Sequence, residues 1–145
     1  MMLLLGDALD DRLAPDEPRY RSRGEAQIGR LLDHYGIPFL YEQPTPVCDE
    51  GRMRVLYPDF TLPARDNLLI EYAGMMDQPE YAFRTNHKQR VYAANGFQSL
   101  FLYPRDIVGP RWTHGVLERI AYARPNTSKP RWSYPQRPTY GRRWL

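Results

Sequence analysis

Hydrophobic and polar residues recur with several distinct periods in the middle of the chain. In SRGEAQIGRLLDHYG, the apolar positions follow one helical face, with Ser22 as a candidate N-cap and Gly36 as a C-terminal stop. Glu25 stands three residues after Ser22, as in a capping box. The pattern therefore predicts a helix over this segment.

Three segments with strand-like patterns follow this helix. The run IPFLYEQP is short and ends at a proline, and RMRVLYPDFTLP alternates Met53, Val55 and Tyr57 on one side before a bend at Pro58. After the polar turn ARDN, the run LLIEYAG is almost continuously apolar, as a buried central strand should be. We predict that the first two segments are neighbouring antiparallel strands and that the third builds the core.

The second half of the chain adds two helices and a strand. Pro79 suits the first position of a helix that ends near Ala94, just before the turn pair Asn95-Gly96. The run FQSLFLYP predicts a strand over residues 97–103, parallel to the preceding one because the helix between them is a crossover. THGVLERIAYA predicts a third, shorter helix. The expected order is α-β-β-β-α-β-α.

The two ends of the chain differ from this middle part in charge. The first 18 residues contain a single basic residue, Arg12, and five acidic ones: Asp7, Asp10, Asp11, Asp16 and Glu17. Residues 124–145 carry Arg124, Lys129, Arg131, Arg137, Arg142 and Arg143 with no acidic residue, among prolines and aromatic side chains. We therefore predict an acidic flexible leader over residues 1–20, one domain over residues 21–123, and an extended basic tail over residues 124–145 that suits phosphate.

Composition excludes several classes of protein. The 145 residues fit one domain, and the apolar start MMLLLG is far shorter than the roughly 18 residues of a membrane span, so we expect a cytoplasmic protein. Cys48 is the single cysteine, which rules out an internal disulfide and a cysteine zinc cluster. His34, His87 and His114 lack the spacing of metal ligands, so we interpret them as ordinary surface or boundary residues.

Two carboxylates lie where the second and third predicted strands should bring them together. Asp59 follows the proline bend and Glu71 lies near the end of the adjacent strand. Hard cations such as Mg²⁺ and Mn²⁺ prefer such oxygen ligands, and phosphodiester hydrolysis is the natural use of the bound ion. Glu25 could add a third oxygen from the first helix. Each also has a structural interpretation, with Asp59 as a turn residue, Glu25 as a helix cap and Glu71 as a solvated strand end.

These motifs, in this order, resemble the PD-(D/E)xK nuclease superfamily. The likeness rests on GEAQIGRLL in the first helix, YPDF on the second strand and LIEYAG on the third, and it covers roughly residues 21–103. It implies an α/β fold with a restriction-endonuclease-like αβββαβ core, in which helices flank a mixed central sheet. The segments around these motifs are most similar to RecB-like and transposon-endonuclease-like branches.

The resemblance also implies roles for individual residues. Asp59 and Glu71 match the two metal ligands of the superfamily, Glu25 matches a first-helix glutamate of several branches, and the main-chain carbonyl of Tyr72 would supply a further oxygen. The implied cofactor is Mg²⁺ or Mn²⁺. Ala73 departs from the pattern, because the superfamily places a lysine two residues after the strand glutamate.

The second predicted helix offers a replacement for this lysine. In RecB-like branches this helix carries a glutamine and, four residues later, a tyrosine, which share one helical face. Here the same spacing reads Lys88 and Tyr92. We predict that Lys88 supplies the missing ammonium group and that Tyr92 supports the site. The alternative is that Lys88 is one solvated charge on an amphipathic helix, beside Arg84 and Arg90.

The expected activity is that of a Mg²⁺-dependent DNA endonuclease, in which Asp59, Glu71 and Glu25 hold the ion and Lys88 assists the attacking water. The alternative is a catalytically inactive nuclease-fold module that binds DNA or assembles a larger DNA-processing complex. The expected partner is DNA, together with a second copy of the chain or a larger machine reached through the tail, and no membrane. The residues expected to contact DNA are Arg21, Arg23, Arg84, Arg90, Lys129, Arg131, Trp132, Arg142 and Arg143.

Overall fold

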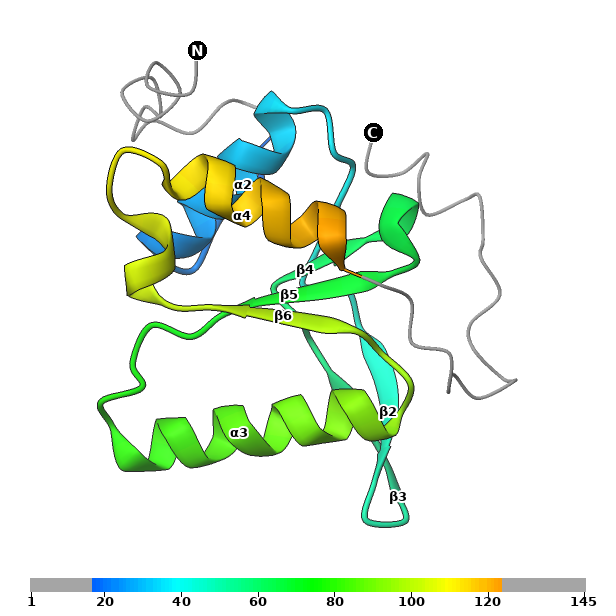
Figure 1. The fold of residues 1–145 in the computed structure, drawn as a ribbon. Helices are drawn as coiled ribbons and strands as arrows, with labels where there is room; N and C mark the ends of the chain where they lie inside the picture. The colour runs from blue at the N-terminus through cyan, green and yellow to red at the C-terminus, as the bar shows by residue number, and fades with distance from the viewer. Residues whose placement is uncertain (1–16, 124–145) are drawn as a thin grey trace.

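A four-stranded mixed sheet with helices on both faces organises residues 17–123, the part of the chain that this computed structural model describes (Figure 1). The described helices are α2 (Arg23–His34), α3 (Pro79–Ala94) and α4 (Trp112–Tyr122). The strands are β1 (Leu40–Tyr41), β2 (Thr45–Asp49), β3 (Arg52–Leu56), β4 (Phe60–Leu62), β5 (Leu68–Tyr72) and β6 (Ser99–Leu102). Two short 3-10 helices, η1 (Pro63–Arg65) and η2 (Pro104–Ile107), complete the order. The predicted leader and basic tail lie almost wholly outside the described residues.

The central sheet has the strand order β1-β4-β5-β6. Strand β4 pairs antiparallel with both β1 and β5, whereas β5 and β6 run parallel. Helix α3 makes the crossover between the parallel strands and covers one face, while α2 and α4 cover the other (Figure 1). The predicted mixed sheet, flanking helices and parallel crossover are confirmed. None of the described helices is long and apolar enough to cross a membrane.

Helix α2 forms as its sequence predicts. The side chain of Ser22 accepts a hydrogen bond from the Glu25 backbone N–H at 3.1 Å, which satisfies one free donor of the first turn. The apolar stripe of Ile28, Leu31 and Leu32 is fully buried in the main core against β4, β5 and α4. Burial of this stripe against the sheet, together with the cap, fixes where α2 begins and which face it presents.

Helix α3 begins at Pro79 and ends at Ala94, as predicted. Proline fits the first helical position because its missing N–H would have no helical partner there. Beyond the end of the helix, Gly96 takes a φ of 80°, a left-handed conformation that favours glycine. The fully buried Tyr92 packs with Leu69 and Phe101, which fixes α3 against β5 and β6.

The strands between α2 and β5 differ from the sequence prediction. The segment RMRVLYPDFTLP is not one strand but two, β3 and β4, in different sheets, and IPFLYEQP contributes only the two residues of β1. Strand β2 was not predicted. It pairs with β3 through a tight turn in which Glu50 and Gly51 have φ values of 51° and 78°. Both central turn residues have positive φ, as in the turns that favour two-residue hairpins, so Gly51 was an available but weak signal.

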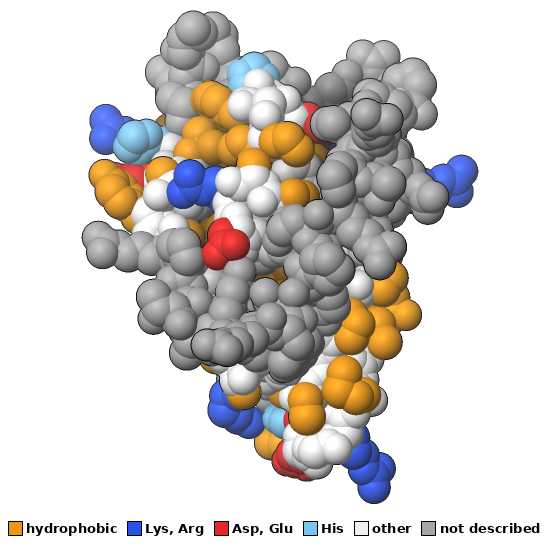
Figure 2. Space-filling view, turned by 90° about the vertical axis from the view of Figure 1, so that its right-hand side faces the viewer, with side chains coloured by type: hydrophobic (Ala, Val, Ile, Leu, Met, Phe, Trp, Pro, Cys, Tyr) orange, Lys and Arg blue, Asp and Glu red, His pale blue; other side chains and the backbone are white. Residues whose placement is uncertain are grey.

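The β2–β3 hairpin projects from the body of the molecule and exposes an apolar face. Met53, Val55 and Tyr57 are 67%, 48% and 55% exposed, although their alternation is that of a half-buried strand. Figure 2, which views the molecule from the hairpin side, shows hydrophobic side chains gathered on this lower projection. The alternation correctly indicated an extended strand but not which face the fold would bury.

Asn95 holds the hairpin against the end of α3. Its side-chain amide accepts a hydrogen bond from the Cys48 N–H and donates one to the Cys48 carbonyl, both at 2.8 Å. The same amide donates to the Val91 carbonyl at 2.8 Å, and Asn95 is only 7% exposed. A second contact joins His87 of α3 to Asp49 of β2 at 2.9 Å, and His87 is a half-buried boundary residue beside this carboxylate.

We expect Asn95→Ala to lower the free energy of unfolding by about 1–3 kcal/mol, because it removes three hydrogen bonds of a buried side chain, two of which join β2 to the end of α3. Chemical denaturation monitored by circular dichroism measures this change. Asn86→Ala, on an exposed position of the same helix, is the matched control and should change stability by less than about 0.5 kcal/mol. Equal effects of the two substitutions would contradict the anchoring role of Asn95.

Candidate active site

The buried carboxylate of Glu71 is the centre of the candidate site. Glu71 lies on β5 and is 5% exposed. The Tyr92 hydroxyl donates to Glu71 Oε1 at 2.8 Å, and Lys88 Nζ donates to Glu71 Oε2 at 3.2 Å. Both donors come from α3, where a spacing of four residues places them on one helical face. The lysine and the tyrosine that the sequence paired are therefore brought to the same carboxylate.

Ala73 occupies the position at which the superfamily pattern has its lysine. Side chains two residues apart in an extended strand share a face, so Ala73 lies on the same side of β5 as Glu71. Its backbone N–H donates to the Leu102 carbonyl at 2.8 Å, which extends the β5–β6 pairing by one residue, and its side chain is 2% exposed. The short side chain leaves the approach to Glu71 to Lys88, which is anchored on the helix facing this side of the sheet.

Asp59 lies beside Glu71 on the neighbouring strand. Because Phe60 pairs with Ile70 in the antiparallel β4–β5 ladder, the preceding Asp59 falls next to Glu71. Asp59 Oδ2 accepts a hydrogen bond from the Tyr72 backbone N–H at 2.7 Å. The Pro58 bend therefore directs this carboxylate toward the end of β5, as the sequence predicted.

Glu25 approaches the two strand carboxylates from the first turn of α2. Its Oε1 accepts a hydrogen bond from the Tyr41 hydroxyl at 2.5 Å, and its Oε2 accepts one from the Ser22 hydroxyl at 2.9 Å. Helix α2 lies close to β5 because Gly24 packs directly on the ring of Tyr72, where an added Cβ would come within 2.3 Å of ring atoms. The role of Glu25 as a third metal ligand stays a prediction.

Electrostatics shows that the three carboxylates act on one another. Burial, followed by the charges of Glu71 and Glu25, raises the pKa of Asp59 to about 8, although the Tyr72 N–H and Lys88 act in the opposite direction. Burial also raises the pKa of Glu71, and the charge of Lys88 and the hydrogen bond from Tyr92 oppose this rise. The negative charge at this strand end is therefore costly without a further cation.

The donor set fits a divalent ion held by two carboxylates. Mg²⁺ binds proteins through one or two carboxylates and keeps several waters, which matches the Asp59 and Glu71 pair. Within residues 17–123, no group of three or more His, Cys, Asp or Glu side chains is arranged to hold a metal ion together. The Tyr72 carbonyl accepts a long hydrogen bond of 3.5 Å from the Tyr81 hydroxyl, and its predicted role as a metal ligand stays a prediction.

The residues expected to contact DNA are spread over several elements. Arg21, just before α2, forms an ion pair with Glu42 at 3.1 Å, and Arg84 on α3 lies 3.9 Å from Glu80. Arg23 and Arg90 have exposed side chains. The other expected contacts lie outside the described residues: Lys129, Arg131, Trp132, Arg142 and Arg143.

Two tyrosines of this region were not identified from the sequence. Tyr41 reaches Glu25 only because β1 pairs with β4, a register that short-range patterns do not specify. Tyr81 accepts a hydrogen bond from the Gly74 N–H at 3.2 Å and thereby holds the loop after β5. Tyr81 precedes Lys88 by seven residues, two helical turns, so the helical spacing of α3 could have indicated it.

Comparisons with protein-family models, curated proteins and solved structures give no match to this chain. The site is therefore interpreted from its own geometry. Two adjacent carboxylates, one of them contacted by an ammonium group and a tyrosine hydroxyl, can bind a divalent cation and orient a water molecule.

The raised pKa of Asp59 predicts how its removal changes stability with pH. A carboxyl with a folded-state pKa near 8 and an ordinary value of 3.8 binds its proton more tightly in the folded chain, so it lowers stability as pH rises between these values. Asp59→Asn cannot ionise but keeps an oxygen for the Tyr72 N–H. Without divalent metal, we expect the stability advantage of Asp59→Asn over the wild type to grow from pH 5 to about pH 8.

Thermal unfolding at a series of pH values in the presence of a chelator measures this difference. Asp77→Asn, which removes an exposed carboxylate from the loop between β5 and α3, is the control. A difference between Asp59→Asn and the wild type that does not change with pH would show that Asp59 titrates like an ordinary surface aspartate.

Proposed function

We propose that this protein is a Mg²⁺-dependent deoxyribonuclease of the PD-(D/E)xK type whose catalytic lysine is carried by a helix instead of the strand. The observation that carries the proposal is the position of Lys88 Nζ, 3.2 Å from Glu71 Oε2, where Ala73 leaves the strand without a lysine. The neighbouring Asp59 completes the pair of carboxylates that the chemistry requires.

The topology supports this proposal. In the restriction-endonuclease-like arrangement that we propose, an antiparallel strand pair carries the two acidic residues, and a crossover helix leads to a parallel fourth strand. Strands β4 and β5, helix α3 and strand β6 follow this plan. The β2–β3 hairpin is an addition between the first strand and the Pro-Asp motif.

Asp59 and Glu71 would hold the metal ion, with Glu25 and the Tyr72 carbonyl as further oxygens at the same strand end. The bound ion lowers the pKa of a water molecule and offsets negative charge on the phosphate. Tyr92 is fully buried and holds Glu71 Oε1, so it fixes the orientation of this carboxylate. Both strand carboxylates are thus positioned before substrate arrives.

Lys88 has a different environment from Tyr92. Its side chain is 35% exposed, so its ammonium group stands at the solvent-facing side of the site, where water and a phosphate enter. There Lys88 orients the attacking water and stabilises the charge that develops as the water oxygen bonds to phosphorus and the sugar oxygen leaves. Pre-positioned donors of this kind are effective because they need not reorganise during the reaction.

The proposed substrate is DNA. Exposed arginines lie on the two helices that contribute site residues, with Arg21 just before α2, Arg23 at its start, and Arg84 and Arg90 on α3. Such residues neutralise phosphates without reading sequence. Cleavage of both strands would need two active sites, through a second copy of the chain or a larger DNA-processing machine, whereas a single copy would nick DNA.

We expect Lys88→Ala to reduce the rate of DNA cleavage by at least about a hundredfold with little change in DNA affinity, because it removes an electrostatic contact made to the reacting groups. Single-turnover cleavage of a plasmid in Mg²⁺ measures the rate. Gln89→Ala, at the next and exposed position of α3, is the matched control and should cleave at the wild-type rate. Arg90→Ala should mainly weaken DNA binding.

A rescue experiment tests whether a lysine at position 73 can replace Lys88 beside Glu71. Since Ala73 and Glu71 share a face of the sheet, a lysine introduced at position 73 can approach Glu71 from the strand. The double variant Ala73→Lys with Lys88→Ala should therefore recover part of the lost activity. Normal cleavage by Lys88→Ala would refute its role, and DNA binding without any cleavage by the wild type would favour the inactive module.

Asp59→Ala and Glu71→Ala should each abolish cleavage while the chain remains folded, because either change removes a proposed metal ligand and relieves repulsion between buried carboxylates. Cleavage assays, Mn²⁺ titration calorimetry and circular dichroism together measure this outcome. Wild-type activity or undiminished Mn²⁺ affinity in either variant would exclude that residue as a ligand.

A further inference from the structure

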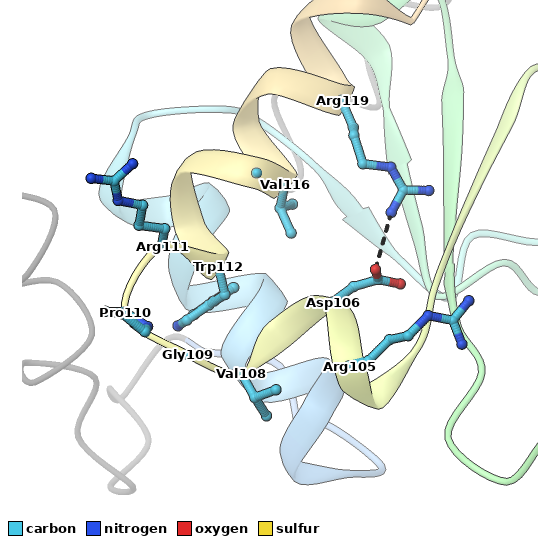
Figure 3. Close-up of a pocket in the computed structure, with 10 residues that line it drawn as sticks. Arg105, Asp106, Val108, Gly109, Pro110, Arg111, Trp112, Val116 and Arg119 are labelled. Atoms are coloured by element: carbon cyan, nitrogen blue, oxygen red, sulfur yellow. Dashed lines mark ion pairs between the residues drawn. The ribbon is translucent and has the colours of Figure 1, made fainter.

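A pocket of about 480 Å³ lies between η2 and the start of α4, outside the carboxylate site (Figure 3). Its volume falls within the roughly 300–1,000 Å³ of typical small-ligand pockets and exceeds what one phosphate group needs. The residues that line it include Arg105, Asp106, Val108, Arg111, Trp112 and Arg119. Three arginines against one aspartate make the lining electropositive.

The charged groups of the pocket fall into two sets. Asp106 accepts a hydrogen bond from the Tyr103 N–H at 2.8 Å and lies 3.6 Å from Arg119, so this pair closes one wall of the pocket. Neither Arg105 nor Arg111 makes an ion pair with a described residue, and the Arg105 guanidinium stacks over the Tyr103 ring at 4.7 Å from its centroid. Figure 3 shows their side chains on opposite sides of the pocket, each pointing away from the other, with Trp112 next to Arg111. Two cations are therefore available at two separate points of the rim.

The floor between these arginines is apolar but contains an unused donor. Trp112 is 8% exposed, and its indole N–H has no acceptor among the described residues. Val108, which is 65% exposed, and Pro110 form the adjoining rim. The first turn of α4 has no side-chain cap hydrogen bond, and the Trp112 backbone N–H donates to the Gly109 carbonyl at 3.5 Å. The pocket lining therefore combines two arginine side chains with the Trp112 ring and its N–H donor.

The pocket lies at the same end of the sheet as the carboxylates. Strands β5 and β6 are parallel and Tyr72 pairs with Leu102, so η2 begins close to the point where the segment with Glu71 and Ala73 leaves the sheet. Figure 1 shows η2 and the start of α4 at this end of the molecule. A strand bound at Glu71 on the α3 face would reach the pocket on the α4 face by passing around the ends of β5 and β6.

We infer that this pocket receives one unpaired nucleotide of the DNA strand next to the cleaved phosphate. The nucleoside lies over Trp112 and against the apolar rim of Val108 and Pro110, and its two flanking phosphates contact Arg105 and Arg111. A base can enter such a pocket only when it is not stacked and paired within a duplex. The inference rests on the proposed nuclease function and specifies its substrate class as DNA with an unpaired segment beside the cut.

The test compares the binding of two oligonucleotides, a blunt duplex and the same duplex with a single-stranded overhang, by fluorescence anisotropy in EDTA. The wild type should bind the overhang DNA more tightly. The double variant Arg105→Ala with Arg111→Ala should lose about tenfold or more of that affinity, while its affinity for blunt duplex changes little. The slope of log affinity against log salt concentration for the overhang DNA should become shallower by roughly one to two units. Trp112→Phe, which keeps the ring but lacks the N–H donor, should also weaken overhang binding selectively.

Arg52→Ala removes an exposed arginine at the start of β3 and is the charge-matched control, which should keep the preference for the overhang. Equal binding of both DNAs by the wild type, or equal losses on both DNAs in the double variant, would overturn the inference. Because the assay needs neither metal nor cleavage, the two proposals can fail separately. A wild type that prefers the overhang through Arg105 and Arg111 but never cleaves would refute only the proposed activity, whereas cleavage without this preference would refute only the pocket.

Discussion

The burial of one carboxylate, that of Glu71, sets the conditions for the rest of the site. A carboxylate removed from water is stable only if charges or hydrogen bonds replace its hydration. The Tyr92 hydroxyl and the Lys88 ammonium supply this replacement from a single helix. The apolar packing of Tyr92 on Leu69 and Phe101 places α3 across the sheet, and the requirement of Glu71 explains why Lys88 and Tyr92 face inward from it.

The sheet brings the other groups to the same point. Asp59 reaches Glu71 through the register of β4 with β5, and Glu25 is brought near by the contact of Gly24 with Tyr72. Burial and neighbouring negative charge, including that of Glu25, raise the pKa of Asp59 and of Glu71, which is poor for stability but suited to a cation. The cost of this arrangement is the main physical reason to interpret the cluster as functional and not as a chance grouping of polar residues.

Local signals predicted some parts of the fold well. Helix α2 has its serine cap, α3 has a proline start and a glycine after its end, and β5 has a continuous apolar run, so each could be identified from neighbouring residues alone. The proximity of Lys88 to Glu71 was also predictable, because the spacing to Tyr92 fixes the face of α3. The split of one predicted strand into β3 and β4 was not predictable. Pro58 indicated a bend, but β3 lies in a second sheet because it pairs with β2, and Asn95 contacts β2 from 47 residues away in sequence. The Tyr41 contact with Glu25 likewise depends on the pairing of β1 with β4.

The central claim is that Asp59 and Glu71 form a metal site beside which Lys88 stands. The most direct measurement is the anomalous scattering of Mn²⁺ in crystals grown with that ion. We expect one strong peak at the strand end, within coordination distance of a carboxylate oxygen from Asp59 and one from Glu71, with Lys88 Nζ turned toward a water bound to the ion. The account would be contradicted if Mn²⁺ bound only at other positions of the chain while Lys88 still donated its hydrogen bond to a Glu71 that holds no metal.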